Sequence, residues 1–316
     1  MSGEAPRDSS ETARPGSTPG GSGPEGLLIA ALFGDLSPHP WRDPAAASED
    51  PHSLFEKRSR AMGWLSDLST VSTGGTDPAT DRATDTETGG VAPAGSWSMH
   101  EAGPELPGLG PDSPLAAWFQ VGIGPVPADR PLPVQPFLCC ADDVLSRFGA
   151  LTLRAVQMLL PVHQLRSTPR RAMLPSLDSI GWFSECEPRA RTEVRLTMDS
   201  GTRPSIPAIA PELLRSLRRE EQTLFVCDSY SVTDHPALAE RSPFSDHHWS
   251  GPPRHRATFH GTLAEWSLDA VGWLAAFLAD ATAREDLTAP VLLTIGKADL
   301  PPGYRGTSSV TPPARR

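Results

Sequence analysis

Residues 256–297 decide the fold expected for this chain: they read RATFHGTLAEW (256–266), SLDAVGWLAAFLADATARED (267–286) and, after three further residues, PVLLTIGK (290–297). The first stretch alternates apolar and polar side chains, which is typical of a half-buried strand. In the second, apolar residues recur at three- and four-residue steps after Ser267, a residue type that favours the N-cap of a helix. Pro290 stops any continuation, and the apolar run after it predicts an interior strand. We therefore expect a strand, a helix and a strand.

A similar set of elements precedes this one along the chain. Residues 192–198 alternate as a strand does, Pro211 suits the first turn of a leucine-bearing helix, and residues 223–227 form an apolar strand. From 192 to 295 the order is strand, helix, strand, strand, helix, strand. This order predicts an α+β or α/β domain with the βαββαβ arrangement of ferredoxin-like domains. The alternative is a mixed sheet covered by helices on one face or on both.

A weaker strand–helix–strand pattern runs from Trp118 to Val162. We expect a strand at 118–123, a short helix at 142–148 and a strand at 151–162. A helix through Leu160 is the alternative for the last of these, because the run contains few β-branched residues. No sequence repeat relates the units, so any duplication would be structural only.

The charge of the chain is uneven. The net charge is −10 at pH 7, but residues 1–110 carry 16 acidic and 7 basic side chains, whereas residues 111–316 carry 22 and 21. A nearly neutral globular part argues against nucleic acid as the ligand, because phosphate binding needs a basic surface. Lys57 and Lys297 are the only lysines among 28 basic residues. With abundant Ala, Gly and Pro, this indicates a GC-rich genome, and we expect a bacterial protein.

Targeting and redox signals favour the cytoplasm. The first 25 residues lack an apolar stretch, and the apolar run at 27–33 is too short for a membrane span, which needs about 20 residues. The four cysteines have neither metal-like nor disulfide-like spacing, as is typical of idle thiols in a reducing cytosol. We therefore expect an intracellular protein without a membrane segment, a metal or a cofactor. Its oligomeric state is left open.

Composition divides the chain into five parts. Polar tracts that bury little cannot offset the entropy of ordering, so they are expected to be disordered. The expected parts are a disordered segment (1–25), short helical segments (26–69), a flexible linker (70–113), an α/β globular domain (114–299) and a disordered tail (300–316). Within the second part, the apolar segment GLLIAALFGDL (26–36) is expected to be a second helix or a strand.

Residues 53–69 have the periodicity of an amphipathic helix. Ser53 with Glu56 three residues later fits a capping box. An isolated helix of about four turns is marginal, so its apolar stripe needs a surface to lie on. That surface belongs either to the globular domain of this chain or to another protein. The apolar positions, which are the candidates for contact with a partner, are Leu54, Phe55, Met62, Leu65 and Leu68.

Two motifs flank the 256–297 unit. Four histidines and an aspartate lie within 15 positions, but their spacing matches no metal motif: Asp246, His247, His248, His255 and His260. TIGKAD at 294–299 resembles the guanine-recognition signature of GTPases. However, Gly296 stands where that signature has asparagine or threonine, and no phosphate-binding glycine loop occurs in the chain. We expect loop histidines without a metal, and no nucleotide.

Catalytic signatures are equally weak. Asp228 and Ser229 follow a strand, with Asp234 and His235 in the next loop, and enzymes do use such groupings. No G-x-S-x-G motif accompanies them. The sequence therefore favours a non-catalytic protein-binding, scaffold or regulatory module whose partner contacts the N-terminal third. A hydrolase with its site in the 228–260 region is the alternative.

Overall fold

The computed structural model describes residues 26–42, 49–65, 96–104, 114–165, 180–187, 189–219, 223–233 and 244–298, and every structural statement below refers to these residues. The first half of the chain contains β1 (Gly26–Pro38), α1 (Pro51–Ala61), β2 (Trp97–Gly103), β3 (Leu115–Ile123), α2 (Val134–Phe148) and β4 (Gly149–Leu160). The second half contains α3 (Ile180–Ser184), β5 (Thr192–Asp199), α4 (Ser205–Arg219), β6 (Phe225–Thr233), β7 (Arg256–Leu263), α5 (Leu268–Arg284) and β8 (Val291–Lys297). Two short 3-10 helices, η3 (Val162–Leu165) and η5 (Asp246–His248), lie in connections.

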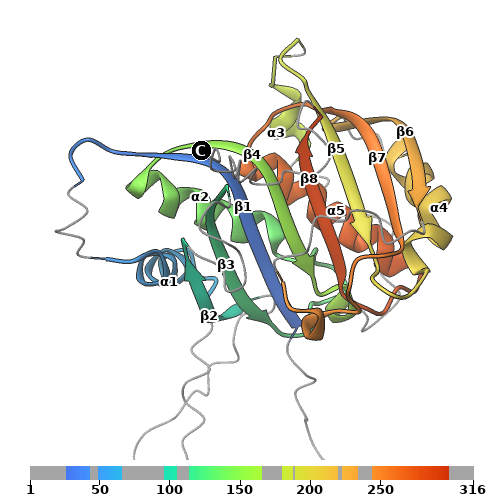
Figure 1. The fold of residues 1–316 in the computed structure, drawn as a ribbon, viewed down its shortest axis with the longest axis horizontal. Coiled ribbons are helices and arrows are strands. Elements are labelled where there is room, and N and C mark those ends of the chain that lie inside the picture. Colours follow the sequence, from blue (N-terminus) through green and yellow to red (C-terminus); the bar gives the residue numbers. More distant parts are fainter. Residues whose placement is uncertain are drawn as a thin grey trace, which may run out of the picture.

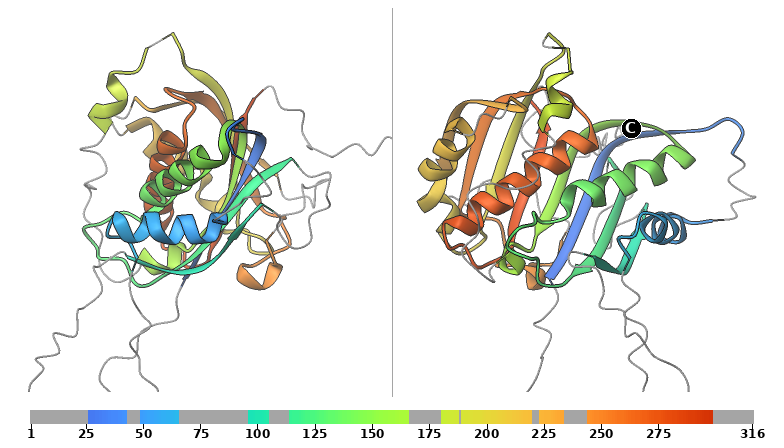
Figure 2. Two further views of the ribbon diagram at one scale, coloured as in Figure 1. Left: turned by 90° about the vertical axis from the view of Figure 1, so that its left-hand side faces the viewer. Right: turned by 180° about the vertical axis from the view of Figure 1, so that it is seen from behind.

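The strands form one eight-stranded sheet in the order β2-β3-β1-β4-β8-β5-β7-β6. Every pairing in it is antiparallel. Helices α1, α2, α4 and α5 lie on one face of this sheet, as Figures 1 and 2 show. The α+β class expected from the sequence is thus confirmed in its coarse form. The expectation of a mixed sheet is wrong, because no parallel pair joins these strands.

The order of elements in the first half of the chain recurs in the second half. β1-α1-β2-β3-α2-β4 is followed, after α3, by β5-α4-β6-β7-α5-β8. The strands of the two sets also lie in equivalent positions, because the sheet reads β2-β3-β1-β4 from one edge and β6-β7-β5-β8 from the other. β4 and β8 meet at the centre and pair from Ala155↔Gly296 to Leu160↔Val291.

The unit that decided the expected fold is present as β7, α5 and β8. The Ser267 hydroxyl accepts a hydrogen bond from the Ala270 N–H at 3.1 Å and so caps α5 as expected. Fourteen residues of α5 are buried, because the helix lies on the sheet beside α2 (Figure 2) and also contacts α4 and η3. Such burial on several sides explains why its apolar stripe is so wide.

Two strands lie in segments to which the sequence assigned no definite strand. Residues 26–38, whose apolar run left a helix or a strand open, form β1 between β3 and β4, and residues 97–103, expected within a flexible linker, form the edge strand β2. β1 is apolar on both faces, with Leu28 in the main core and Ile29 in a second cluster. A run that is apolar at almost every position has no periodicity by which a strand can be distinguished from a helix. The division of the chain into domains stays a prediction.

Helix boundaries differ from the expectation in two places. α4 begins at Ser205, so Pro211 lies inside the helix and not in its first turn. α2 extends back to Val134, although it ends before Gly149 as expected. The run after Gly149 is a strand and not a helix, because it continues the sheet between β1 and β8.

The two faces of the sheet differ. The main core fills the space between the sheet and the helices. On the opposite face, the open face, a smaller cluster contains Ile29, Trp118 and Leu159 of the sheet, covered by Phe244 and Trp249 from the loop before β7. The part of the open face formed by β5 and β7 is polar, because the apolar residues of these two strands point toward the helices.

Candidate functional site

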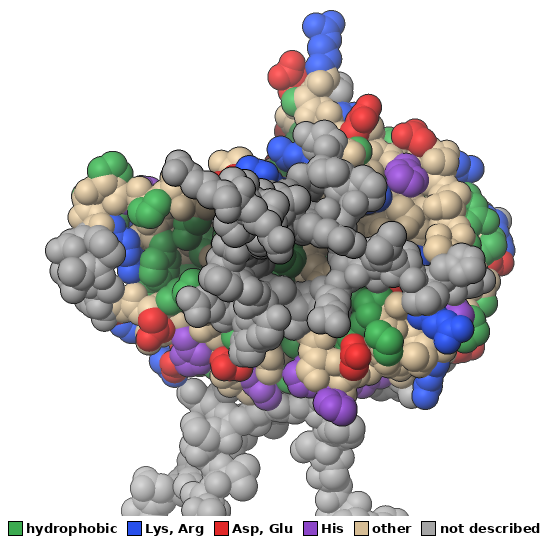
Figure 3. Space-filling view, viewed as in Figure 1, with side chains coloured by type: hydrophobic (Ala, Val, Ile, Leu, Met, Phe, Trp, Pro, Cys, Tyr) green, Lys and Arg blue, Asp and Glu red, His purple; other side chains and the backbone are tan. Residues whose placement is uncertain are grey.

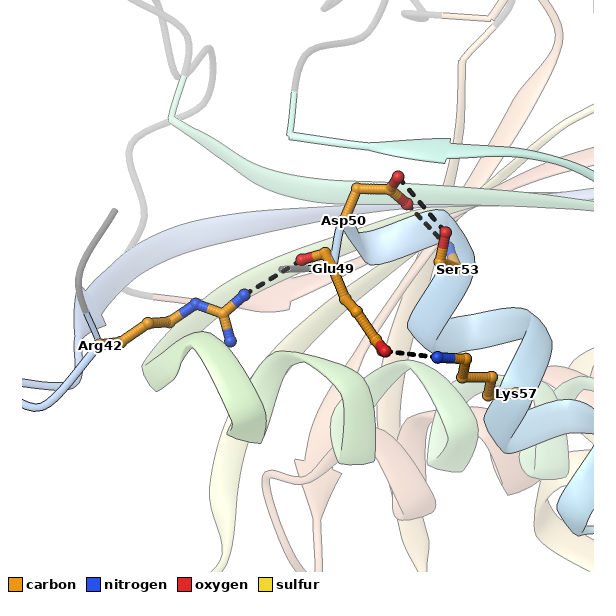
Figure 4. Close-up of polar contacts among 5 residues, drawn as sticks. All are labelled: Arg42, Glu49, Asp50, Ser53 and Lys57. Atoms are coloured by element: carbon orange, nitrogen blue, oxygen red, sulfur yellow. Dashed lines mark hydrogen bonds and ion pairs between the residues drawn. The ribbon is translucent and has the colours of Figure 1, made fainter. Parts of the chain in front are cut away.

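The start of α1 is fixed by Asp50 and not by Ser53. The Asp50 carboxylate accepts a hydrogen bond from the Ser53 N–H at 2.7 Å, and Pro51 occupies the first turn. This bond from Ser53 lowers the pKa of Asp50 below its ordinary value. The Asp-Pro pair at 50–51 is a start signal that the capping-box interpretation overlooked. Figure 4 shows this cap.

Arg42 joins three elements at this end of the sheet. Its guanidinium donates to the Arg147 carbonyl at 3.0 Å and to the Glu49 carbonyl at 3.2 Å. The same group stacks over the Phe148 ring, 3.9 Å from its centroid. The Glu49 side chain then pairs with Lys57 on α1 (Figure 4). The turn after β1 is therefore tied both to the start of α1 and to the C-terminal end of α2.

α1 docks on its own sheet through Phe55. This ring is completely buried and lies 4.9 Å from Phe119, 5.6 Å from Phe137 and 6.4 Å from Trp97, measured between centroids. Its neighbours come from β3, α2 and β2. The apolar stripe of the helix therefore finds a surface within this chain.

The five expected partner-contact residues have different surroundings. Phe55 is inaccessible to a partner because it belongs to the core. Leu54 and Leu65 are half-buried against that core, whereas Met62 is 51% exposed. Leu68 lies outside the described residues. The structure therefore leaves Leu54, Met62 and Leu65 partly accessible.

A groove of about 310 Å³ lies between α1 and α2. Leu54 and Val144 contribute its apolar lining, and Lys57, Arg58 and Arg147 contribute cations. Arg58 donates to Asp143 across the groove at 2.7 Å. Both partners of this ion pair are well exposed, so it contributes little stability and can exchange for a ligand. Arg147 makes no ion pair within the described part of the chain.

An exposed tryptophan lies in the turn after β1, which is bonded to the C-terminal end of α2. Trp41 is 72% exposed and stacks on His39 with ring centroids 5.1 Å apart. The turn that carries both rings is held to the end of α2 by hydrogen bonds from His39 to Ser146 and Phe148. Exposed tryptophan next to arginine is typical of the residues that dominate binding energy at protein interfaces. No sequence pattern singled out Trp41 or Arg42.

Family models, curated proteins and solved structures contain no match to this chain. Any function must therefore be argued from the residues themselves.

The described residues of the alternative hydrolytic site lie on the edge strand β6 and on the loop and strand that precede and form β7. Asp228 is exposed at a bulge on the edge strand β6, and Ser229 faces His260 across the β6–β7 pair. Asp234 and His235 lie outside the described residues. These positions show no hydrogen-bonded Ser-His-Asp arrangement within the described part of the chain.

The histidine cluster is not a metal centre in the described residues. Asp246, His247 and His248 are exposed in η5, and His260 is exposed on β7. In Figure 3 histidine side chains lie along the lower margin of the open face and also near its upper right, so they do not gather in one place. No group of three or more His, Cys, Asp or Glu side chains in the described ranges is close enough to hold a metal ion.

The four cysteines are free thiols with raised pKa values. Burial raises the pKa of Cys140 to about 11 and that of Cys227 to about 11, and burial together with the nearby Asp269 raises that of Cys139 further. A nucleophilic cysteine needs the opposite shift, toward the thiolate. No helix among the described residues is long and apolar enough to cross a membrane.

Asp199 holds the loop that carries the histidines. Its carboxylate is 3% exposed and accepts hydrogen bonds from the Gly201 N–H at 2.7 Å and the Arg254 N–H at 3.2 Å. Burial raises its pKa above the ordinary value, although these two bonds and the charge of Arg256 act in the opposite direction. The ionised form is therefore less favourable in the folded chain than in the unfolded chain.

We expect the Asp199→Asn variant to gain stability relative to the wild type as pH rises. A carboxyl with a raised folded pKa binds its proton more tightly when folded, so wild-type stability falls as pH rises from the ordinary value through the raised one. Asparagine keeps an acceptor oxygen for both N–H groups but does not ionise. Urea unfolding of both proteins at several pH values from 3 to 7 measures the difference, on the order of 1 kcal/mol per pKa unit. A pH-independent difference would contradict the assignment.

Proposed function

We propose that this chain is a protein-binding module without chemistry of its own, and that the groove between α1 and α2 takes a short acidic segment of a partner protein. The groove itself is the observation that carries the proposal. Its apolar lining from Leu54 and Val144 suits an aliphatic side chain, and its cations suit carboxylates. Trp41, in the turn whose Arg42 is bonded to the carbonyl of the groove residue Arg147, supplies a large exposed aromatic surface.

Charge complementarity selects an acidic occupant. Lys57, Arg58 and Arg147 meet at the groove, and of the acidic side chains only Asp143 lines it. Arginine binds carboxylates through two parallel hydrogen bonds, which adds orientation to attraction. An acidic protein partner is sufficient to account for the three cations at this groove, without a phosphate-binding role. The cytoplasmic location expected from the sequence is part of the same proposal.

Selection from a phage-displayed library of random peptides tests the proposal directly. Peptides recovered on the full chain should be rich in Asp, Glu and aliphatic residues. Their affinity, measured by fluorescence anisotropy, should fall about tenfold or more for Trp41→Ala and for Arg147→Glu, because loss of an interface Trp or Arg commonly costs over 1 kcal/mol. Both side chains are exposed, so neither change disturbs the core.

Two matched variants serve as controls. Trp182 on α3 is 70% exposed, and Arg203 is exposed in the turn before α4. Trp182→Ala and Arg203→Glu should leave peptide affinity unchanged. Selected peptides without acidic residues, or equal losses in the controls, would overturn the proposal.

We infer in addition that each set of six elements is a ferredoxin-like unit. The order β4-β1-β3-β2 and the order β8-β5-β7-β6 both place the fourth strand first, then the first, third and second. Antiparallel pairing and helices on one face support the same arrangement. An experimental structure with another strand order in either half would contradict it.

A further inference from the structure

β6 forms one edge of the eight-stranded sheet, and no other strand among the described residues pairs with its outer side (Figure 1). Six large hydrophobic side chains are exposed in the described part of the chain, and three of them lie on this strand: Val226, Tyr230 and Val232. Their exposed fractions are 48%, 37% and 43%. Backbone N–H and C=O groups along an open edge, with exposed β-branched and aromatic side chains, are a template for pairing with a further strand.

The opposite edge of the sheet is closed. Beside β2, Leu65 forms a parallel bridge with Trp97, and the Trp97 N–H donates to the Trp64 carbonyl at 2.8 Å. The middle of β2 has an irregular register with β3 and carries the exposed His100 and Glu101. A covering segment, a bulge and charged side chains are common means by which an edge strand avoids pairing with another chain.

The protection of β6 is confined to its first half. Its register with β7 shifts between Cys227 and Ser229, which leaves Asp228 in a bulge. The Asp228 carbonyl accepts a hydrogen bond from Arg218 at 2.9 Å. After the bulge, residues 229–233 read Ser-Tyr-Ser-Val-Thr, without a charge, a proline or a glycine. The open part of the edge is therefore residues 229–233, which we call the β6 edge segment.

The two apolar residues of the β6 edge segment lie on the helix face of the sheet. Tyr230 is opposite Phe259 on β7, and the two rings stack with centroids 5.9 Å apart. Val232 is opposite Ala257. Both of these β7 residues belong to the main core, so the two exposed side chains continue that core to the edge of the sheet. The other three residues of the segment bear hydroxyls and alternate with them, so they lie on the open face.

We propose that the β6 edge segment pairs with the same segment of a second copy of this chain, antiparallel and with Ser231 on the two-fold axis. In that register Tyr230 lies opposite Val232 of the second copy, and the converse pair lies on the other side of the axis. Opposite residues of an antiparallel pair share a face, and aromatic–β-branched pairs stabilise a sheet. Ser229 lies opposite Thr233 on the open face. The pairing brings no like charges together, because the segment has none.

The sequence of the β6 edge segment favours a second copy as the occupant. Read from either end, it gives a hydroxyl, an apolar, a hydroxyl, an apolar and a hydroxyl side chain. A two-fold axis requires a self-complementary patch of this kind, since the same residues contribute from both copies. Only the β6 edge is open among the described residues, so pairing ends at a dimer and does not continue into a filament.

The proposed dimer is compatible with the groove between α1 and α2. β6 and β2 are at opposite ends of the sheet, and α1 contacts β2, so the groove stays accessible in each copy. A contact through so short a segment is small, so we expect a weak dimer with a dissociation constant of about 1–100 µM.

Sedimentation velocity of the full chain, at concentrations below and above this range, tests the dimer. The wild type should shift from monomer to dimer as its concentration rises. Ser231→Lys and Ser231→Glu should each stay monomeric, because two like charges would lie directly opposite each other across the axis. An equimolar mixture of these two variants should form a heterodimer, since opposite charges then face each other.

The same substitutions in the exposed turn before α4, Thr202→Lys and Thr202→Glu, are the controls and should dimerise as the wild type does. Because Ser231 is exposed, its variants should also unfold at the temperature of the monomeric wild type. A wild type that stays monomeric would overturn the proposal and leave the edge to an extended segment of another protein. Dissociation of both Ser231 variants without recovery in their mixture would overturn it as well, because Ser231 would then not lie on the axis.

Discussion

Phe55→Ala is expected to destabilise the folded chain by about 3–5 kcal/mol, as loss of a fully buried aromatic ring commonly does. The ring contacts three other aromatic rings from β2, β3 and α2, so the cavity left by alanine would be lined by rigid groups that cannot collapse into it. Chemical denaturation followed by tryptophan fluorescence measures the change, since Trp97 is one of these neighbours.

Met62→Ala is the matched control on the same segment. Met62 is half exposed, and its loss should change the free energy of unfolding by no more than about 0.5 kcal/mol. If Phe55→Ala were equally mild, α1 would not be part of the core. The helix would then again be a free amphipathic segment for a partner.

The contrast between Phe55 and Met62 shows which features of a helix can be predicted from its sequence. The periodicity of α5 predicted its position and cap, because its stripe, its Ser267 cap and Pro290 all agree. The stripe of α1 predicted a helix but not what it packs against, because the same pattern serves docking within a chain or on another protein. Phe55 therefore looked like a partner contact until its neighbours were known.

The two candidate sites depend on contacts that no single-sequence pattern contains. The groove joins α1 to α2 through Leu54 and Val144, 90 positions apart in the chain. Strand register likewise joins segments far apart in sequence, and Gln157 is an ordinary strand residue until Thr294 lies beside it. The alternation of apolar and polar side chains predicted that β5 and β7 are half-buried strands, but not which face of the sheet the helices leave open.

Gly272→Ala is expected to destabilise the chain by about 1–3 kcal/mol, although alanine is the better helix former. A Cβ atom at this position of α5 would lie 2.7 Å from the Gln135 Cα and 3.3 Å from the Val134 carbonyl oxygen. Backbone atoms cannot move aside as a flexible side chain can, so the start of α2 would have to shift. The shift would also disturb the hydrogen bond from Gln135 to Asp269, now 2.7 Å long.

The control for this change is a helical glycine with open space around it. Apart from its chain neighbours and the backbone of its own helix, nothing lies within 4 Å of the Cβ position of Gly181 on α3, so Gly181→Ala should be neutral or stabilising by up to about 1 kcal/mol. Denaturation midpoints of the two variants should therefore move in opposite directions, or only that of Gly272→Ala should move. If both substitutions, Gly272→Ala and Gly181→Ala, stabilised the chain, α2 and α5 would not be in close backbone contact. Because α2 belongs to the first set of six elements and α5 to the second, that contact is one of the features that bind the two halves into one structure.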